Sequence, residues 1–177
     1  MQGGAMKINK VTQYITVSPQ IMPGDVKEIA DLGYKVIICN RPDGEGADQP
    51  SFKEIEVEAK KYGLEAIYLP VVSGKVTDKD AQEFMALVPA LAKPIFAYCR
   101  SGMRSITLWA LSQASQHRPV PEILEAAKLA GYDLYGVARR ILNEGKTPTD
   151  TADIEHDIVV VGAGALLFLL VLVFLLL

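Results

Sequence analysis

Residues Pro94-Ile95-Phe96-Ala97-Tyr98-Cys99-Arg100-Ser101-Gly102-Met103-Arg104-Ser105 contain the transition on which the fold depends. The run 94–98 predicts a buried strand, because strands covered on both faces carry continuous apolar residues. A helix is expected from 104 to 115, so a short loop joins the two and begins at Cys99. Open α/β sheets bind ligands beyond the carboxyl ends of their strands. Cys99 is therefore expected at a ligand-binding edge.

The segments on either side repeat this alternation of strand and helix. Further strands are expected at 14–17, 35–39 and 66–69, and helices at 25–32, 51–62, 77–88, 121–130 and 134–142. Strands that alternate with helices indicate an α/β domain. The predicted fold is thus a mainly parallel central sheet flanked by helices.

Composition excludes several classes of protein. The chain has 177 residues, of which 50% are hydrophobic, and a formal net charge of −3. Without a basic block there is no electrostatic support for nucleic-acid binding. The two cysteines, Cys39 and Cys99, are too few for a disulfide framework, and no His/Cys cluster predicts a metal site. We expect no cofactor, and a reducing, cytoplasmic location for the catalytic domain.

The C-terminal part of the sequence differs from the rest. We expect a catalytic domain over 1–142, a polar linker over 143–157 and an apolar helix over the uncharged run 158–177. Twenty helical residues span about 30 Å, enough to cross a bilayer, so the tail is a candidate membrane anchor. Alternatively, 157–165 resembles the strand and glycine turn of a dinucleotide-binding unit, but position 167 is Leu, and FAD or NAD binding is not expected.

The loop after the strand combines a nucleophile with groups that bind anions. Backbone N–H groups of the loop and the start of the next helix attract negative charge and favour a thiolate at Cys99. Arg104 offers a forked guanidinium for two oxygens of an anionic substrate. Catalytic roles are predicted for Cys99 and Arg104, and substrate contacts for Arg100, Ser101, Gly102, Met103 and Ser105, with Ser105 expected to donate to the sulfur. The alternative is a buried structural cysteine.

Loop length distinguishes between two chemistries. Four residues separate Cys99 from Arg104, which resembles the active-site loop of rhodanese-type sulfurtransferases. Tyrosine and dual-specificity phosphatases instead have five, usually with His before the Cys, where this chain has Tyr98. The leading hypothesis is a sulfurtransferase that forms a persulfide on Cys99. The alternatives are a phosphatase acting through a cysteinyl-phosphate and a non-catalytic anion-binding module.

A second polar segment is expected at the same edge of the sheet. Arg41 and Asp43 follow the strand 35–39. They could orient the substrate, and Asp43 could act as a general acid. The alternative is an Asx-type turn fixed by Pro42 and Gly44.

Two motifs together resemble one particular family. Residues 36–45 (Val-Ile-Ile-Cys-Asn-Arg-Pro-Asp-Gly-Glu), 49–51 and 98–105 are similar to the phosphatase-like domain of beta-lactamase-hydrolase-like proteins. The resemblance covers about 7–142 and implies a dual-specificity-phosphatase-like fold. Because some members are fused to persulfide-oxidising domains or to sulfide:quinone-type flavoproteins, it also implies sulfide or persulfide handling and a sulfide-oxidising partner. Cys39 departs from the family, in which Asn is commoner at this position.

Overall fold

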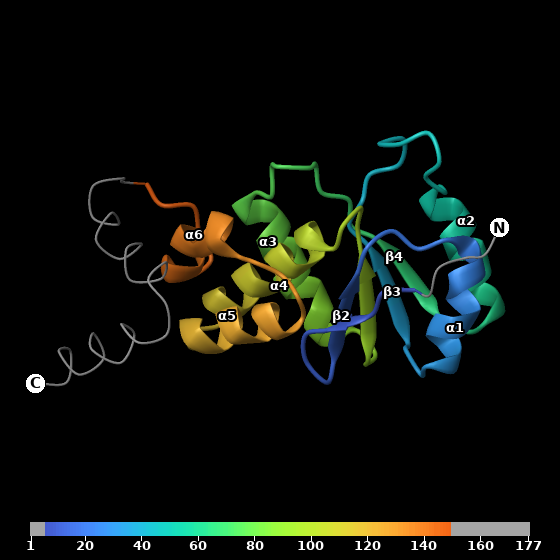
Figure 1. Cartoon of the computed structure of the whole chain (residues 1–177), viewed down its shortest axis with the longest axis horizontal. Coiled ribbons are helices and arrows are strands. Elements are labelled where there is room, and N and C mark those ends of the chain that lie inside the picture. The colour runs from blue at the N-terminus through green and yellow to red at the C-terminus, as the bar shows by residue number, and fades with distance from the viewer. Residues whose placement is uncertain (1–5, 150–177) are drawn as a thin grey trace, which may run out of the picture.

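The computed structural model describes residues 6–149 and contains a five-stranded sheet with helices on both sides (Figure 1). The strands are β1 (Asn9–Lys10), β2 (Ile15–Ser18), β3 (Val36–Cys39), β4 (Glu65–Tyr68) and β5 (Ile95–Tyr98). The α-helices are α1 (Val26–Asp31), α2 (Phe52–Lys61), α3 (Asp78–Leu87), α4 (Met103–Ser115), α5 (Val120–Leu129) and α6 (Ala138–Leu142). Short 3-10 turns lie at Pro23–Asp25, Val88–Ala90 and Tyr135–Val137.

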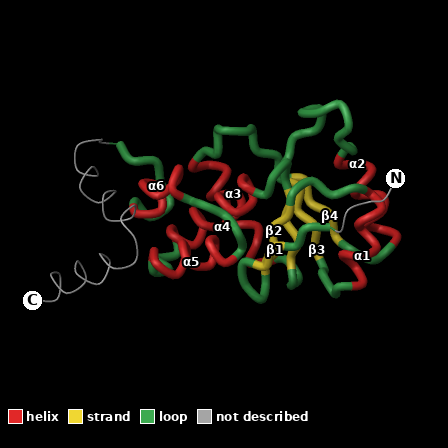
Figure 2. The backbone as a smooth tube through the Cα atoms, in the orientation of Figure 1, coloured by secondary structure: helices red, strands yellow, loops and turns green. Residues whose placement is uncertain are grey.

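The sheet is mixed and has the order β1-β2-β5-β3-β4. Figure 2 shows its strands between the two groups of helices. Strands β2, β5, β3 and β4 run parallel, as the alternation with helices predicts, and β1 pairs antiparallel with β2. Strand β1 was not predicted, because a strand of two residues has no detectable period. The order places β5, which leads into Cys99, in the middle of the sheet.

The two faces of the sheet support separate apolar cores. Ile37 and Phe96 belong to the core on the side of α1 and α2, and Ile38 and Ala97 belong to the core on the side of α3 and α4. This alternation follows from the two-residue period of a strand. Figure 1 shows these helices on opposite sides of the sheet. Since both faces are covered, β3 and β5 are buried along their whole length, which explains their continuous apolar sequences.

Side chains at the helix starts fix where α2 and α3 begin. Ser51 accepts a hydrogen bond from the Glu54 backbone while the Glu54 carboxylate accepts from Ser51, and Thr77 and Asp80 repeat the arrangement. These capping boxes satisfy backbone donors that have no partner within the helix. Both starts agree with the sequence-based prediction.

The segment just after α6 packs against the domain. The Thr147 backbone and hydroxyl both donate to the Asp78 carboxylate, which also pairs with Arg140. A side chain at Gly145 would overlap the carbonyl of Leu111. The part of the predicted linker between 143 and 149 is therefore attached to the domain.

The predicted apolar tail 158–177 lies outside the described residues. Within 6–149, every helix is too short or too polar to cross a bilayer. The anchor, the linker end and the glycine turn at 157–165 therefore stay predictions.

Candidate active site

Cys99 lies one residue beyond β5, at the point where the chain turns into α4. Its side chain is buried, and the Gly102 amide donates a hydrogen bond to the Cys99 sulfur at 3.2 Å. Gly102 is the residue before the helix and has φ of 91°, a left-handed conformation that favours glycine. The loop is therefore wound so that a backbone donor at the start of α4 faces the sulfur, an arrangement that favours negative charge there.

Arg104 lies on the first turn of α4 and is held from one side. Its Nη1 and Nη2 atoms each donate at 2.8 Å to the two carboxylate oxygens of Glu45, and Nη1 also donates to the Val71 carbonyl at 2.8 Å. A guanidinium has five N–H donors. These contacts use three and leave Nε–H and one Nη2–H, both on the same edge of the group.

The Cys99 side chain is close enough to the Arg104 guanidinium to influence its pKa. Burial alone would lower the pKa of Arg104, but hydrogen bonding to Glu45 and the nearby Cys99 sulfur raise it overall. The paired donors on this edge match the spacing of two oxygens on a carboxylate or phosphate. An anion beside Cys99 would thus meet a guanidinium already fixed in place.

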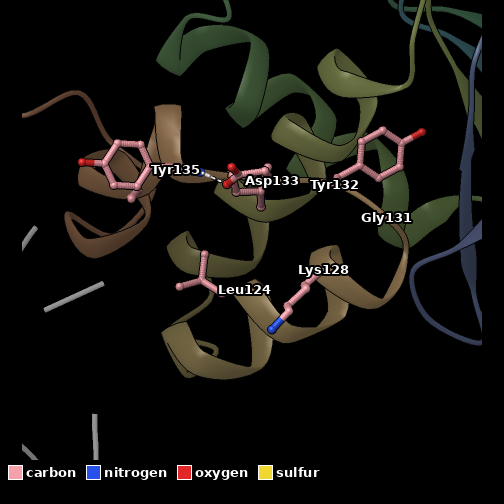
Figure 3. A pocket seen from close by; sticks show the side chains of 8 residues that line it. Leu124, Lys128, Gly131, Tyr132, Asp133 and Tyr135 are labelled. Atoms are coloured by element: carbon pink, nitrogen blue, oxygen red, sulfur yellow. Dashed lines mark hydrogen bonds between the residues drawn. The ribbon is translucent and has the colours of Figure 1, made fainter. Parts of the chain in front are cut away.

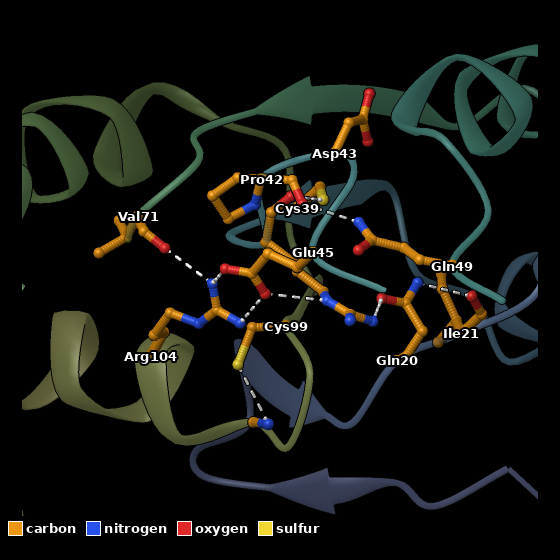
Figure 4. A network of polar contacts seen from close by, with 12 residues as sticks. Gln20, Ile21, Cys39, Pro42, Asp43, Glu45, Gln49, Val71, Cys99 and Arg104 are labelled. Atoms are coloured by element: carbon orange, nitrogen blue, oxygen red, sulfur yellow. Dashed lines mark hydrogen bonds and ion pairs between the residues drawn. The ribbon is translucent and has the colours of Figure 1, made fainter. Parts of the chain in front are cut away.

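Glu45 holds two arginines at once (Figure 4). Its Oε2 also accepts from Arg41 Nε at 3.1 Å, and Arg41 Nη1 donates to Gln20 Oε1 at 2.9 Å. The Arg104 hydrogen bond, followed by that from Arg41, lowers the pKa of Glu45. Arg41 is therefore near the site, where sequence analysis expected it, but two of its donors are engaged with protein partners.

Ser105 does not act as expected from the sequence. Its hydroxyl donates to Asn40 Oδ1 at 2.8 Å, and Asn40 Nδ2 donates to the Leu69 carbonyl at 2.9 Å. Because a hydroxyl has one proton, it cannot donate to the Cys99 sulfur in this arrangement. Ser105 and Asn40 are both fully buried and tie α4 to the ends of β3 and β4.

Asp43 is oriented by its own loop. Its carboxylate accepts from the Phe52 backbone at the start of α2 at 2.8 Å, and its backbone N–H donates to the Tyr68 hydroxyl. Figure 4 shows the Asp43 carboxylate directed away from Cys99. The Asp43 carboxylate is therefore engaged at the start of α2 rather than in the Asx-type turn that the sequence suggested. Its role as a general acid stays a prediction that this orientation does not support.

The remaining loop residues form the rim of the site. Arg100, Ser101 and Met103 are exposed, and the Arg100 carbonyl accepts from the Gln20 backbone at 3.3 Å. Their predicted substrate contacts, like the catalytic roles of Cys99 and Arg104, stay predictions.

Sequence reasoning missed Glu45 and Tyr132 as residues of the site. Tyr132 follows α5, accepts from Asn9 Nδ2 at 2.9 Å and donates to the Ser101 carbonyl at 3.3 Å. Glu45 lies four residues after Arg41, a spacing that signals an ion pair only within a helix. No local pattern connects Tyr132 to a loop 31 residues earlier.

Cys39 has a separate environment from Cys99. Its thiol donates to the Arg41 carbonyl at 3.2 Å, and both cysteines are free. Burial is the main cause that raises the pKa of Cys39. Among residues 6–149 no group of three His, Cys, Asp or Glu side chains could hold a metal ion.

The loop between β4 and α3 borders the site through Val71 and carries no acid. Residues 69–77 read Leu-Pro-Val-Val-Ser-Gly-Lys-Val-Thr, without Asp, Glu or His. A group that protonates a leaving oxygen would have to come from elsewhere in the chain or from water.

The fold is that of protein-tyrosine and dual-specificity phosphatases, and the Cys99–Arg104 loop occupies the same strand-to-helix junction with one residue fewer. The PP-IP phosphatase catalytic core from S. cerevisiae, solved with citrate, shares the fold with a TM-score of 0.60 at 16% identity, covering 85% of this chain and 89% of that one. A candidate phosphatase from Neisseria meningitidis is more similar, with 36% identity and a TM-score of 0.72 over 78% of this chain and 99% of its own.

The family assignment follows from the sequence. Residues 7–116 match the family described as beta-lactamase hydrolase-like protein, phosphatase-like domain, and the chain belongs to this family. A beta-lactamase hydrolase-like protein from Agrobacterium fabrum is 30% identical over 135 residues, which are 76% of this chain. The chain spans 31% of the length of that relative. The resemblance inferred from the two motifs is confirmed, and the family supports the expectation of an enzyme.

Proposed function

We propose that the domain is a cysteine-dependent hydrolase of phosphate monoesters. The observation that carries the proposal is the arrangement of three groups at the start of α4. The Cys99 sulfur accepts from the Gly102 amide, and Arg104 is held by Glu45 with its free edge toward that sulfur. A nucleophile placed between fixed donors is the arrangement that stabilises an anion in transfer chemistry.

The first step is attack by the Cys99 thiolate on phosphorus. An S–P bond forms, the P–O bond to the leaving group breaks, and the leaving oxygen departs with the electron pair. Arg104 and the loop amides hold the non-bridging oxygens throughout, because fixed donors require no reorganisation as charge develops. In the second step water attacks phosphorus, the S–P bond breaks, and inorganic phosphate and the thiolate are released.

Neither the loop 69–77 nor Asp43 supplies a carboxylate or an imidazole that protonates the leaving oxygen. This follows from the absence of Asp, Glu and His in 69–77 and from the engagement of Asp43 with Phe52. We therefore expect aryl phosphates to react much faster than alkyl phosphates, because phenolate is the better leaving group.

Similarity to phosphatases supports the same proposal. The match with the N. meningitidis protein, a candidate phosphatase, covers 99% of that protein. The yeast enzyme, whose fold is shared, acts on PP-IP and was solved with citrate, an anion.

Sulfur transfer is the second candidate, and one observation favours it. Four residues lie between Cys99 and Arg104, one fewer than in tyrosine phosphatases, and the shorter loop suits a persulfide, which adds a single atom. In this reaction the thiolate attacks the sulfane sulfur of thiosulfate, an S–S bond forms, and sulfite leaves with the electron pair. A thiol or cyanide then takes the sulfur. Under this candidate a sulfide-oxidising enzyme would be the functional partner.

One paired experiment distinguishes the candidates. The protein and its Cys99→Ser variant are incubated with an aryl phosphate and, separately, with thiosulfate, and phosphate release and intact mass are measured. We expect phosphate release that depends on Cys99 and no stable sulfur adduct. A gain of one sulfur atom on Cys99 without phosphate release would identify the protein as a sulfurtransferase. If neither phosphate release nor a mass gain is observed, the domain would be a non-catalytic anion-binding module.

The placement of the protein in the cell is a separate proposal. We propose a cytoplasmic catalytic domain held at a membrane by 158–177. Carbonate-resistant sedimentation with membranes that is lost when 158–177 is deleted would support it, and a full-length protein that stays in the supernatant would contradict it.

A further inference from the structure

A chain of hydrogen bonds runs from strand β1 to the sulfur of Cys99. Asn9 Nδ2 donates to the Tyr132 hydroxyl at 2.9 Å, and that hydroxyl donates to the Ser101 carbonyl at 3.3 Å. At the other end of the same peptide group, the Gly102 N–H donates to the Cys99 sulfur at 3.2 Å (Figure 4). The Tyr132 hydroxyl and the Cys99 sulfur therefore bind opposite ends of one peptide group.

The planarity of this peptide group couples its two ends. The bond between Ser101 and Gly102 is trans, and in a planar trans peptide the C=O and N–H bonds point in opposite directions. A donor that holds the carbonyl oxygen on the outside of the loop therefore directs the N–H toward the sulfur. With the group turned over, the carbonyl oxygen would face Cys99 and repel negative charge there.

The local sequence does not fix the orientation of this peptide group. Gly102 has φ of 91°, and glycine, which lacks a Cβ, populates positive and negative φ about equally. The peptide group before Gly102 can therefore turn over with little steric resistance. A Cβ at Gly102 would overlap the Tyr132 hydroxyl, so this hydroxyl lies directly against the turn and can restrain it.

Tyr132 is itself held in place by the end of α5. Gly131 has φ of 83°, and its N–H donates to the Lys128 carbonyl at 2.9 Å. The Tyr132 N–H donates to the Ala127 carbonyl at 2.9 Å, and the two bonds together form the Schellman motif that ends many helices. Figure 3 shows the Tyr132 ring directed away from Lys128 and Tyr135, with the hydroxyl at its far end. The hydroxyl thus reaches the cysteine loop from a fixed backbone position.

The proton of the Tyr132 hydroxyl is directed at Ser101. Because Asn9 donates to the hydroxyl oxygen, the single hydroxyl proton is left for another acceptor. Burial is the main cause that raises the pKa of Tyr132, and the charge of Cys99 adds to it, while the Asn9 hydrogen bond acts in the opposite direction. The phenol therefore keeps its proton at neutral pH and serves as a donor.

We infer that Tyr132 is a positioning residue, which keeps the Gly102 N–H directed at the Cys99 sulfur. Asn9 orients the Tyr132 hydroxyl for this role. Hydrogen bonds in such a chain polarise and strengthen one another. The inference rests on the proposed function, because it takes Cys99 as the nucleophile, and it adds a residue from outside the loop that prepares this nucleophile.

Hydrogen exchange of the Gly102 amide tests the contact directly. The full-length protein is labelled with 15N-glycine, and exchange is compared with that of Tyr132→Phe, which keeps the ring and removes the hydroxyl. Exchange at Gly102 should become about fivefold faster, the effect of one weakened hydrogen bond, while exchange at Gly33, which donates to Ala30, should not change. Unchanged exchange at Gly102 would overturn the inference.

A matched control separates this effect from a general loss of stability. Tyr34→Phe also removes a tyrosine hydroxyl, one that pairs with Thr16 at 2.7 Å in the core under α1 and α2. It should leave exchange at Gly102 unchanged. Equal acceleration at Gly102 in Tyr34→Phe and Tyr132→Phe would mean that Tyr132 only stabilises the fold, and the inference would fail.

Asn9→Asp tests the direction of the hydrogen bonds without removing a contact. Aspartate has nearly the same shape but only accepts, so the Tyr132 hydroxyl would donate to it in place of the Ser101 carbonyl. We expect the same faster exchange at Gly102 as in Tyr132→Phe. Full protection of Gly102 in Asn9→Asp would show that the hydroxyl proton does not act through Ser101.

The effect on the sulfur is measured as the pH profile of Cys99 alkylation. The rate of reaction with iodoacetamide is followed by mass at Cys99, and the profile should move to higher pH by about half a unit in Tyr132→Phe, because a donor to the charged form favours that form. The other ionisable side chains near the sulfur are the same in all variants, namely Arg100, Arg104, Glu45 and Cys39. The profile of Tyr34→Phe should coincide with that of the unmodified protein. Coinciding profiles for Tyr132→Phe and the unmodified protein would overturn the inference.

Failure of the proposed function would look different, because neither measurement involves turnover. If no aryl phosphate is hydrolysed while Gly102 exchange and Cys99 alkylation respond to Tyr132→Phe, the positioning role stands and the hydrolase assignment falls. If phosphate release depends on Cys99 but neither measurement responds, the hydrolase assignment stands and the positioning role falls.

Discussion

The ends of β3 and β5 carry the same residue type with opposite chemistry. Cys39 is the last residue of β3 and aligns with Tyr98 of β5, whereas Cys99 follows Tyr98 by one residue. The Cys39 thiol donates to a carbonyl oxygen and packs with the apolar core under α1 and α2. The Cys99 sulfur accepts from an amide at a helix start.

Cys39, a packing residue, and Cys99, a candidate nucleophile, therefore differ by only one position in the alignment of β3 with β5. Because side chains alternate along a strand, the residue after a buried position is directed differently. Burial in the apolar core raises the pKa of the Cys39 thiol, whereas the Cys99 sulfur lies beside the Gly102 amide at the start of α4. The decisive difference is what lies beyond each strand, since β3 leads into a polar loop and β5 into a helix.

The largest expected effect on activity separates the two cysteines, each replaced by serine in turn. Cys99→Ser should lower the rate of phosphate release from an aryl phosphate by about 10³-fold or more, because a serine hydroxyl without a base is a poor nucleophile. Cys39→Ser should stay within about threefold of the unmodified protein, because a hydroxyl also donates to the Arg41 carbonyl. Comparable losses in both variants would remove the distinction between the two cysteines.

The second effect concerns the donors around Cys99. Arg104→Lys should reduce kcat/KM about 100-fold, since an ammonium cannot hold Glu45 with two parallel bonds and also present two donors to an anion. Arg118→Lys, on an exposed pair with Glu122, is the control and should have no effect. If kcat/KM is unchanged in Arg104→Lys, a single positive charge at this position is sufficient to hold the anionic substrate.

The third effect tests the turn that directs the Gly102 amide at the sulfur. Gly33 has almost the same backbone angle, φ of 88°, but has open space around it, whereas a side chain at Gly102 would overlap Tyr132. Urea denaturation should show that Gly33→Ala lowers the free energy of unfolding by about 1 kcal/mol and Gly102→Ala by about 2 kcal/mol or more. Equal losses would show that backbone strain alone limits the loop.

The smallest effect is a dependence of stability on pH through Glu45. Its pKa in the folded protein lies below the ordinary value of a glutamate carboxyl, mainly because Arg104 donates to it. The paired carboxylate therefore stabilises the fold at pH values above that ordinary pKa, and this stabilisation is lost as pH falls through the lowered pKa. The difference in unfolding free energy between the unmodified protein and Glu45→Gln should therefore be constant near neutral pH and shrink in acid. A difference that grows in acid would have the wrong sign for this ion pair.

Local patterns sufficed for most of the fold. The apolar runs at β3 and β5 predicted buried parallel strands, and the Ser51 and Thr77 caps predicted the starts of α2 and α3. They also placed Cys99 at the sheet edge, because strand, loop and helix follow one another within a few residues.

Contacts between distant segments could not be predicted in this way. Glu45 meets Arg104 across 59 residues, and Tyr132 meets Ser101 across 31. Ser105 was expected to face the sulfur because it lies near Cys99 in sequence, but a helix turn directs it to Asn40. For Asp43 the sequence allowed an Asx-type turn or a proton donor, and neither predicts the observed bond to the Phe52 amide, which lies nine residues further along the chain.

The bond between Thr147 and Asp78 has a consequence for the order of assembly on the ribosome. The two residues are 69 positions apart, and Asp78 begins the helix that follows the loop bordering Arg104. Synthesis completes Cys99 and α4 long before Thr147 emerges, and long-range contacts form only after the intervening chain exists. The nascent domain therefore forms the hydrogen bond between Thr147 and Asp78 only after Cys99 has been synthesised. A gene fragment that stops at residue 142 would encode a protein without this hydrogen bond.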